Sequence, residues 1–496
     1  MASESTAARG NKKLRVLLIP FFATSHIQPF TELALSLATA NDDVETTMAV
    51  TPANVSIVKS LLERWHNPAA VKIGTYEFPS VEGLPKGVEN LGKAVTRDES
   101  LLIQVASMSE ALMRPVQEAL IHAQSPDAIV SDMAFVWNSG IAAKLGVPCV
   151  IFSVLGAFSV LAMNHLKDVV APNDAVVLVP RFPVPKIGIP KAELPEFLRR
   201  QDKSMAELFV SIQADCFGLA MNTSSELEKQ YCEMYTSEGY AKRAYFLGPL
   251  SLRPLPPPPS SSSSSMLATA EDCVIMDWLD SKPNRSVVYV SFGSLANVKD
   301  AQLDEIALGL ETSGKSFLWV VRGKEKWTPP KGWEERVKNQ DLGLIIRAWA
   351  PQTAILGHKA VGAFVTQCGW NSVLETVAAG VPVLTWPILF EQFITERLLT
   401  QVLGIGERLF PGLRREESWY DDDDDEEDEV VVLGKDVARA LTTFMKPGGT
   451  GDMARSRVLD LSAKARAAVA QGGSSHRDLH RLVDDLIMAA AKRNPS

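Results

Sequence analysis

Short apolar runs recur along the chain, and most precede a stretch with apolar residues at helical spacing. The first, Leu14 to Pro20, is typical of a central strand in a parallel sheet. Pro29 is predicted to open the helix that follows it. Further strands are expected at 44–50, 71–78, 128–132, 148–153, 218–223, 245–249, 287–292, 317–321, 344–347, 361–366, 381–386 and 404–410. Alternating strand and helix patterns predict an α/β protein with doubly wound parallel sheets.

The two series of strands are separated by an abrupt change in composition. Residues 256–259 are prolines and residues 260–265 are serines, so this stretch cannot bury apolar surface. The expected organisation is a disordered N-terminus at 1–13, a first domain at 14–250, a linker at 251–270, a second domain at 271–474 and a terminal helix at 475–496 that packs back on the first domain. Two similar halves would place a ligand cleft between them.

Composition narrows the class of protein. A chain of 496 residues is too long for one core, and 46% hydrophobic with 22% charged residues is usual for a soluble protein. The formal net charge is −9, but residues 421–429 are nine consecutive acidic residues, so the remainder is close to neutral. We expect this run to be a solvated loop. The absence of a basic face argues against nucleic acid as a partner.

Cysteine usage and hydropathy predict the compartment. The five cysteines are scattered, odd in number and without CxxC spacing: Cys149, Cys216, Cys232, Cys273 and Cys368. This pattern argues for a reducing environment and against disulfides or a zinc site. The first residues lack the apolar segment of a signal peptide, and no apolar run reaches the roughly 18–20 residues of a membrane span. We expect a cytoplasmic, soluble protein.

The stretch Trp349 to Gln392 contains two predicted strand-to-helix crossings. The strand at 361–366 is followed by a turn and by Ser372-x-x-Glu375, which has the spacing of a capping box. A helix that begins straight after a parallel strand presents free N–H groups to an anion, so a phosphate site is predicted here. The alternative is that Ser372 and Glu375 only cap the helix.

His26 and Asp132 each follow a predicted strand of the first half. The carboxyl ends of parallel strands are where ligands bind, and a histidine there can act as a general base. If the two strands are neighbours, Asp132 can orient the imidazole and stabilise its protonated form. Alternatively, His26 is a turn residue and Asp132 a helix cap.

Residues 349–392 resemble, over their full length, the signature box of plant-type UDP-dependent glycosyltransferases of family 1. The family's pattern reads WAPQ…GHxAVGxFxTHCGWNSxLExxxxGVPxxxWPxxxEQ, and only Gln367 departs from it. Ser25 to Pro29 is similar to the family's GHINP, residues 290–294 to its VSFGS, and residues 472–475 to its GGSS. The resemblance implies a GT-B fold, in which two Rossmann-like domains face each other across a cleft.

The resemblance also implies a role for each residue of the donor site. Trp349 would stack on uracil, Ala350 would bond its edge, and Gln352 would lie against the nucleoside. Glu375 would accept from the ribose hydroxyls. The diphosphate would lie at Gln367, Trp370, Asn371 and Ser372 with support from Ser294, and Glu391 and Gln392 would hold the sugar. A glutamine at the last position favours UDP-glucose, and no metal or other cofactor is required.

Catalysis would then use His26 as the base that deprotonates an acceptor hydroxyl, with Asp132 as its partner. Direct attack inverts the sugar from α to β. The acceptor would be a small lipophilic molecule of plant secondary metabolism, such as a flavonoid or another phenolic, and the enzyme a monomer. Candidate acceptor residues are Phe21, Phe22, Phe135, Trp137, Phe158 and Asn164.

Two residues depart from the family pattern, and two alternative functions remain open. Gln367 replaces a histidine and cannot become cationic, so phosphate binding should be somewhat weaker, and Ser25 replaces a glycine beside the acceptor. Attack through carbon, or a silent sugar-nucleotide-binding protein, stays open. A nicotinamide-dependent oxidoreductase would need GxGxxG after the first strand, but no glycine occurs between Gly10 and Gly74.

Overall fold

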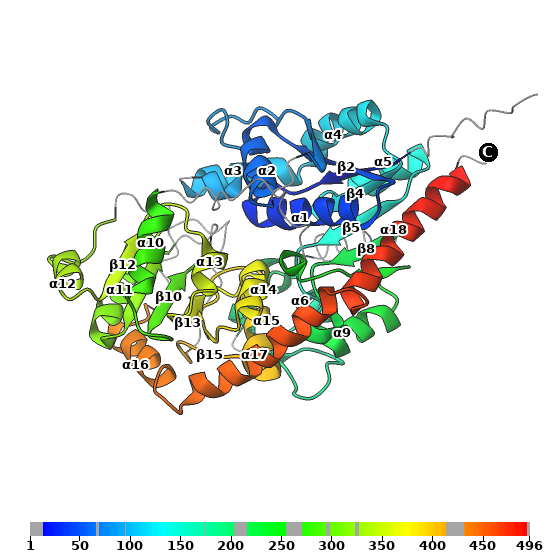
Figure 1. The fold of residues 1–496 in the computed structure, drawn as a ribbon. Coiled ribbons are helices and arrows are strands. Elements are labelled where there is room, and N and C mark those ends of the chain that lie inside the picture. The colour runs from blue at the N-terminus through cyan, green and yellow to red at the C-terminus, as the bar shows by residue number, and fades with distance from the viewer. Residues whose placement is uncertain are drawn as a thin grey trace, which may run out of the picture.

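Two parallel sheets, each flanked by helices, form the two halves of the molecule (Figure 1). The structure is a computed structural model, and it describes residues 13–65, 69–94, 96–173, 175–202, 216–253, 270–293, 298–322, 327–412 and 431–493. Most of the expected linker, the acidic run 421–429 and the N-terminal segment 1–12 lie outside these residues.

The first sheet has seven parallel strands in the order β3-β2-β1-β4-β5-β8-β9. Their bounds are β1 Leu14–Ile19, β2 Val44–Val50, β3 Val71–Thr75, β4 Ala128–Asp132, β5 Cys149–Ser153, β8 Gly218–Met221 and β9 Ala244–Phe246. The order reverses between β1 and β4, which is the switch point of a doubly wound sheet, where ligands bind.

Helices cover both faces of this sheet (Figure 1). They are α1 Thr24–Ala40, α2 Val55–Arg64, α3 Arg97–Met108, α4 Glu110–Gln124, α5 Trp137–Leu145, α6 Ala157–Leu166, α7 Glu196–Arg199 and α9 Ser225–Ser237, with short 3-10 turns η1 Pro52–Asn54, η2 Leu91–Lys93, η3 Lys191–Glu193 and η4 Leu250–Leu252. A small antiparallel pair, β6 Val176–Leu178 and β7 Gly188–Pro190, precedes η3.

The second sheet has six parallel strands in the order β12-β11-β10-β13-β14-β15. They are β10 Val287–Ser291, β11 Ser316–Val320, β12 Gly343–Ile346, β13 Val361–Thr366, β14 Val383–Thr385 and β15 Gly406–Arg408. Its helices are α10 Ala270–Asp280, α11 Asp300–Ser313, α12 Trp333–Asn339, α13 Gln352–Leu356, α14 Trp370–Ala379, α15 Gln392–Arg397, the π-helical turn η5 Leu398–Val402, α16 Gly434–Phe444 and α17 Thr450–Val469.

The last helix, α18 Ser474–Arg493, packs on the first half although it follows the second. In Figure 1 it continues the line of α17 towards β8 and β9. The hydroxyl of Tyr245 donates to Asp485 over 2.6 Å, and the backbone N–H of Phe246 donates to Asp478 over 2.8 Å. Because Leu482 and Leu486 are also fully buried, this helix ties the end of the chain to the first sheet.

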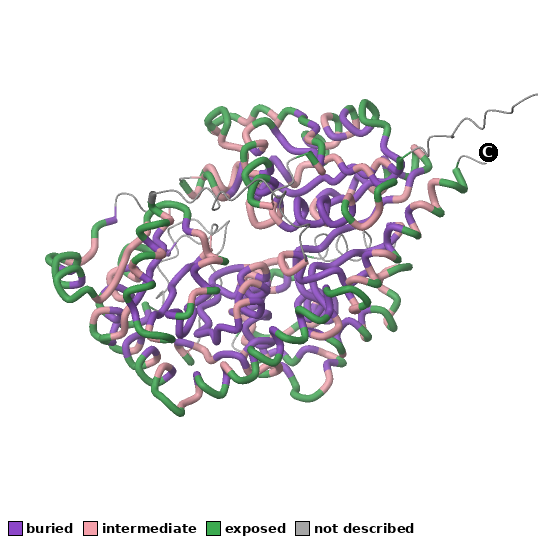
Figure 2. Tube along the Cα trace, in the orientation of Figure 1, coloured by how far each residue is buried: buried purple, intermediate pink, exposed green. Residues whose placement is uncertain are grey.

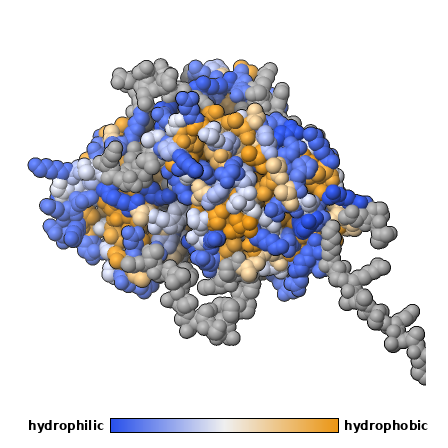
Figure 3. Space-filling view, turned by 90° about the horizontal axis from the view of Figure 1, so that it is seen from above, coloured by the Kyte–Doolittle hydropathy of each residue, from blue (hydrophilic) through white to orange (hydrophobic). Residues whose placement is uncertain are grey.

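The hydrophobic core is continuous between the halves. One cluster of buried side chains extends from the first sheet through Trp370 and Leu374 of α14, and a second fills the far side of the second sheet around Trp319 and Trp333. Figure 2 shows the strands and the facing helices as buried. Figure 3 shows hydrophobic patches interspersed with hydrophilic side chains on one outer face, as on most soluble proteins.

The predicted α/β architecture is confirmed, and the expected strands form within a few residues of their predicted bounds. The predicted start of the first helix was wrong. That helix begins at Thr24, and Pro29 lies inside it. Proline lacks an N–H, so the carbonyl of Ser25, four residues earlier, loses its helical partner at Pro29. His26 therefore lies within the first turn of α1 rather than in a loop.

Candidate active site

His26 and Asp132 are brought together because β1 and β4 are neighbouring parallel strands. Asp132 ends β4, and His26 follows the end of β1, so both lie at the same edge of the sheet. Nδ1 of His26 lies 2.8 Å from Oδ2 of Asp132. Since a carboxylate accepts, Nδ1 is the donor, and Nε2 is left with the lone pair that a general base needs.

The carboxylate of Asp132 is held by the backbone around it. Oδ2 accepts from the N–H of Phe21 and Oδ1 from the N–H of Ala134, each over 3.1 Å. The Asp132 side chain is 1% exposed, whereas that of His26 is 23% exposed. A fixed carboxylate behind a partly open imidazole is the arrangement in which the acid orients the base.

Aromatic side chains extend from His26 into the first half. The ring of Phe21 lies 5.3 Å from the imidazole and 6.1 Å from Phe135, which in turn contacts Phe22 and Trp137. The indole of Trp137 donates to Gln117 over 2.8 Å. All four aromatic side chains are at least nine-tenths buried, so they form a rigid apolar wall beside the base.

The two α6 candidates for acceptor binding, Phe158 and Asn164, are both buried. Phe158 is fully buried and packs edge-on against Phe182 and Tyr231, at 5.2 and 4.8 Å between ring centroids, which is the environment of a core residue. Asn164 is 7% exposed, and its Nδ2 has no hydrogen-bond partner among the described residues. The structure therefore brings Phe22, Phe135 and Trp137 towards His26, but not Phe158.

Trp349 is the one strongly exposed aromatic ring of the signature segment. Its side chain is 50% exposed, and the guanidinium of Arg322 lies over the ring at 4.7 Å. Arg322 follows the end of β11 and also donates to the carbonyl of Gly92 in the first half over 3.4 Å. Ala350, beside Trp349, is 8% exposed. An indole with an open face is suited to stacking on a flat heterocycle.

Gln352, Ser372 and Glu375 form a hydrogen-bonded group beside Trp349. Nε2 of Gln352 donates to Oγ of Ser372 over 3.0 Å and to Oε2 of Glu375 over 2.6 Å. Its Oε1 accepts from the hydroxyl of Tyr289 over 3.1 Å. Burial raises the pKa of Glu375, although the hydrogen bonds from Gln352 and Thr353 lower it. Gln352 thus orients the carboxylate that would meet ribose hydroxyls.

The predicted capping box at Ser372 and Glu375 was wrong. A capping box needs Ser372 as the N-cap, but the helix begins about one turn earlier, with Gly369 as its N-cap and Trp370 as its first residue. Ser372 is therefore already inside α14, and its hydroxyl accepts from Gln352 instead of capping. The helix N-terminus itself does follow the end of β13 closely, which is the arrangement that the predicted anion site needs.

The first two residues of α14 contact the other half of the molecule. The indole of Trp370 donates to the carbonyl of Asn222 over 2.8 Å, and the side-chain amide of Asn371 donates to the carbonyl of Ser25 over 2.5 Å. A Cβ on Gly156 would lie 2.8 Å from the Trp370 ring, so this close approach requires glycine. The Trp370 side chain thus joins the halves, and only its backbone is free to serve a phosphate.

Gln367 lies at the end of β13, beside Gly293 at the end of β10. A Cβ on Gly293, whose φ is +77°, would come within 2.2 Å of Nε2 of Gln367. The side chain is 8% exposed, and its Oε1 accepts from the hydroxyl of Thr366 over 3.3 Å. Its amide nitrogen therefore faces Gly293, at the carboxyl end of the neighbouring strand. Ser294 lies outside the described residues.

Glu391 is the N-cap of α15, and Gln392 is the first residue of that helix. Oε1 of Gln392 accepts from the N–H groups of Ile388 and Leu389, over 3.0 and 3.1 Å, which leaves its Nε2 to donate elsewhere. Burial raises the pKa of Glu391 to about 7, while the charge of His26 opposes that shift. The preceding residue, Phe390, has a φ of +54°, a strained conformation typical of functional loops.

Comparison with known proteins gives the family of this chain. Residues 265–407 match the family model described as "UDP-glucoronosyl and UDP-glucosyl transferase". The chain is 34% identical to UDP-glucose flavonoid 3-O-glucosyltransferase 7 of Fragaria ananassa over 98% of both chains. The chain belongs to this family of UDP-dependent glycosyltransferases.

Solved structures of the family have the same fold. The chain superimposes on UGT73P12 of Glycyrrhiza uralensis, solved with glycyrrhetinic acid 3-O-monoglucuronide, with a TM-score of 0.84 at 30% identity over 97% of both chains. UGT71G1 of Medicago truncatula, solved with UDP-glucose, gives 0.77 at 25% identity over 97% of this chain and 100% of that one. The predicted GT-B fold and UDP-glycosyltransferase class are confirmed.

Two further features concern the described residues of this glycosyltransferase as a whole. No helix among them is long and apolar enough to cross a membrane. Within the same part of the chain, no three His, Cys, Asp or Glu side chains are grouped as metal ligands. His476 and His480, at i and i+4 on α18, have 3.3 Å between their Nε2 atoms.

Three contributors to the glycosyltransferase site were missed by sequence reasoning. They are Arg322 over Trp349, Tyr289 behind Gln352, and the carbonyl of Ser25 that receives Asn371. Arg322 directly follows a strand of the second sheet, so the rule that ligands bind at the carboxyl ends of strands could have identified it. The other two depend on contacts between segments distant in sequence.

Proposed function

We propose that this enzyme transfers glucose from UDP-glucose to a hydroxyl of a small lipophilic acceptor, such as a flavonoid or another phenolic, with inversion at the anomeric carbon. The main support is the 2.8 Å contact between Nδ1 of His26 and Asp132 at the edge of the first sheet, with Nε2 left available. A relative that acts on a flavonoid and a related structure that holds UDP-glucose agree with both substrates.

The donor would lie along the carboxyl ends of the second sheet. Uracil stacks on the open face of Trp349, whose other face is occupied by Arg322, and the ribose hydroxyls donate to Glu375. The diphosphate lies at the N-terminus of α14, where backbone N–H groups and the helix dipole stabilise its negative charge. Gln367 donates from the adjacent strand end, and Glu391 and Gln392 contact the sugar hydroxyls.

The transfer step follows from that placement. Nε2 of His26 removes the proton from the acceptor hydroxyl as its oxygen attacks the anomeric carbon, on the face opposite to the leaving UDP. The carbon–oxygen bond to UDP breaks as the new glycosidic bond forms, so an α-linked donor yields a β-linked product. Asp132 stabilises the imidazolium that results, and α14 stabilises the charge that develops on UDP.

The acceptor would lie against the aromatic wall of Phe21, Phe22 and Phe135. Apolar rings beside a base favour a flat, lipophilic molecule whose hydroxyl reaches His26. Because one structural relative was solved with a triterpenoid glucuronide, the acceptor panel should contain a triterpenoid besides flavonoids and simple phenolics. Acid-labile products indicate O-glucosides, and acid-stable products indicate attack through carbon.

The test is a transfer assay on purified enzyme with UDP-glucose, UDP-galactose and UDP-xylose. His26→Ala should lower kcat by about 10²–10⁴-fold, the usual contribution of a general base. His122→Ala is the control, because His122 is exposed at the end of α4. Unchanged transfer by His26→Ala would refute the general-base assignment, and a preference for UDP-galactose or UDP-xylose would refute the assignment of glucose.

A further inference from the structure

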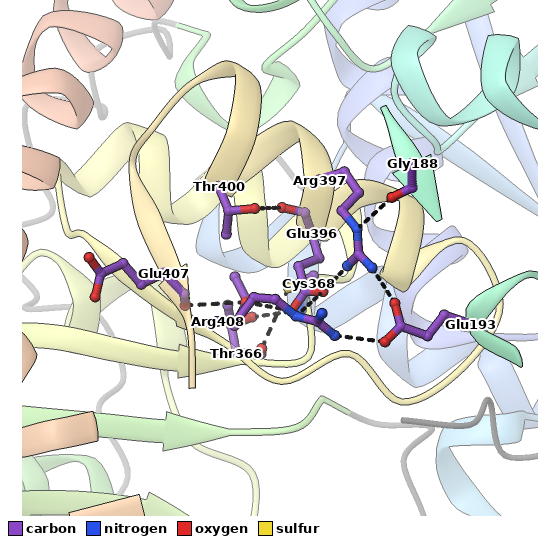
Figure 4. Close-up of polar contacts among 10 residues, drawn as sticks. Gly188, Glu193, Thr366, Cys368, Glu396, Arg397, Thr400, Glu407 and Arg408 are labelled. Atoms are coloured by element: carbon purple, nitrogen blue, oxygen red, sulfur yellow. Dashed lines mark hydrogen bonds and ion pairs between the residues drawn. The ribbon is translucent and has the colours of Figure 1, made fainter. Parts of the chain in front are cut away.

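Four charged side chains, three buried and one partly buried, meet where the β7–η3 segment of the first half contacts α15 and β15 of the second. They are Glu193, Glu396, Arg397 and Arg408 (Figure 4). Glu193 is fully buried, Glu396 and Arg397 are at most 3% exposed, and Arg408 is 23% exposed. We call these four residues the ionic cluster.

Each carboxylate of the ionic cluster is held by both guanidinium groups. Arg397 pairs with Glu193 through Nη2 and with Glu396 through Nη1. Arg408 places Nη2 at 2.7 Å from Oε1 of Glu193 and Nε at 3.0 Å from Oε2 of Glu396. Two positive and two negative charges cancel, so the loss of any one leaves an uncompensated charge in a dry site.

Burial of four charges is an expensive way to join two segments. Removing them from water costs several kcal/mol per ion, and well-packed apolar residues often stabilise a protein equally well. Unlike apolar contacts, however, charge-assisted hydrogen bonds between guanidinium and carboxylate groups fix direction as well as distance. The value of the ionic cluster therefore lies in the position that it imposes on its neighbours.

The ionic cluster lies next to the loop 386–391, which connects β14 to α15. The loop ends at Glu391, and Gln392 is the first residue of α15. The hydroxyl of Thr385, the last residue of β14, donates to Oε1 of Glu396 over 2.7 Å, so the cluster holds the loop where it begins. Arg397 ends α15, the six-residue helix that starts at Gln392. Both ends of the loop are thus anchored on one set of charges.

The first half also contacts the loop through an aromatic pair. The ring of Phe197, four residues after Glu193, lies 6.1 Å from Phe390 at a tilt of 40°. Phe390 has a φ of +54°, which is strained for a bulky residue and persists only where the surroundings enforce it. Glu193 and Phe197 supply such an enforcement from the other half.

We propose that Glu193 is a positioning residue for the donor sugar: through Arg397 and Arg408 it fixes loop 386–391, so that Glu391 and Gln392 meet the hexose. This inference rests on the proposed function, because it takes Glu391 and Gln392 as the sugar contacts. It predicts that a residue from the acceptor half controls recognition of the hexose without touching it. Trp349 follows β12, at the opposite edge of the second sheet from β15, so uracil binding there should be independent of Glu193.

The experiment compares the affinity for UDP-glucose with that for UDP, which lacks the sugar. Glu193→Gln keeps the shape of the side chain but removes its charge. It should lower the affinity for UDP-glucose by about tenfold and the affinity for UDP by less than about twofold. The preference for UDP-glucose over UDP-galactose should fall as well. A purely structural role would lower thermal stability and leave both affinities of the folded fraction unchanged.

Two further variants keep the result decisive. Glu193→Gln combined with Arg408→Met removes one charge of each sign, so it should fold even if the single variant does not, and should show the same loss for UDP-glucose. Asp127→Asn is the matched control, because Asp127 pairs with Arg15 at 3.1 Å at the opposite end of β4. It should leave the difference between UDP-glucose and UDP unchanged.

Gln392→Ala separates this inference from the proposed function. One outcome is that Gln392→Ala weakens the binding of UDP-glucose while the Glu193 variants leave it unchanged, or while they weaken the binding of UDP to the same extent. In either case the positioning role is wrong and the sugar contact stands. If Gln392→Ala has no effect on UDP-glucose, the proposed sugar contact is itself wrong.

Discussion

The side-chain amide of Asn371 donates to the backbone carbonyl of Ser25, and the 2.5 Å hydrogen bond links the two halves next to the general base. The carbonyl is available because Pro29, four residues later in α1, has no N–H to donate. His26 directly follows Ser25, so the N-terminus of α14 and the base are held in one hydrogen-bonded arrangement. Donor binding at α14 and the position of His26 should therefore depend on each other.

Asn371→Ala should lower kcat and the free energy of unfolding, because it leaves the Ser25 carbonyl without its partner. Leaving a buried polar group without a hydrogen-bond partner lowers the free energy of unfolding by about 1–3 kcal/mol. In a Pro29→Ala background the new N–H can bond that carbonyl, so Asn371→Ala should cost less there. Denaturant unfolding and transfer kinetics of the four proteins measure the coupling, and equal losses in both backgrounds would contradict the proposed role of Pro29.

Trp349→Ala should lower the affinity for UDP by about 10–100-fold, since stacking of one base on an aromatic ring contributes about 1–3 kcal/mol to binding. Trp278→Ala is a closely matched control. Trp278 also has a cation over its ring at 4.7 Å, from Lys282, but it lies on α10 outside the site. Calorimetric titration of UDP into both variants compares them, and similar affinities would show that Trp349 is not the uracil platform.

Gln367→His should strengthen UDP binding by about three- to tenfold at pH 6, and less at pH 8. A protonated imidazole makes a charge-assisted hydrogen bond to a phosphate, which is about twice as strong as a neutral one, and its unperturbed pKa is about 6.5. Titrations of UDP at both pH values, with wild type alongside, measure the effect. If the variant binds UDP no better than wild type at pH 6, Gln367 does not face the diphosphate.

Glu32 should make the protein less stable as pH rises from about 4.5 to 8. Burial raises the pKa of this α1 carboxyl to about 8, with a smaller raising effect from Glu375 of the second half, against lowering effects of Gln28 and Arg64. The folded state therefore binds more protons than the unfolded state between the two pKa values, so the free energy of unfolding falls through that range.

Glu32→Gln removes this pH dependence and keeps the shape of the side chain. The variant should be more stable than wild type at pH 9, by roughly 1–2 kcal/mol, and similar to it at pH 5. Denaturant unfolding at both pH values tests this, with Glu45→Gln as the control because Glu45 is partly exposed in the same half and pairs with Lys72. A pH-independent difference would place the effect in packing rather than in ionisation.

The sequence by itself determined the elements and the family. Strands such as 44–50, 128–132 and 361–366 were predicted with their observed bounds, because apolar and β-branched residues predominate in each and such residues fit a strand of a parallel sheet. His26 and Asp132 could be paired in advance, since residues at the ends of neighbouring parallel strands meet at one edge. The signature segment was recognisable because its residue types and spacing are local features.

Only the tertiary structure decided how the two halves meet. The helix containing Pro29 begins before it, and Ser372 does not cap α14, because Asn371 and Gln352 supply hydrogen-bond partners that no local pattern reveals. Glu193 and Arg397 are 204 positions apart, and Ser25 and Asn371 are 346 apart. Such contacts depend on how the two halves of the molecule pack together. The periodicity of a single segment contains no information about that packing.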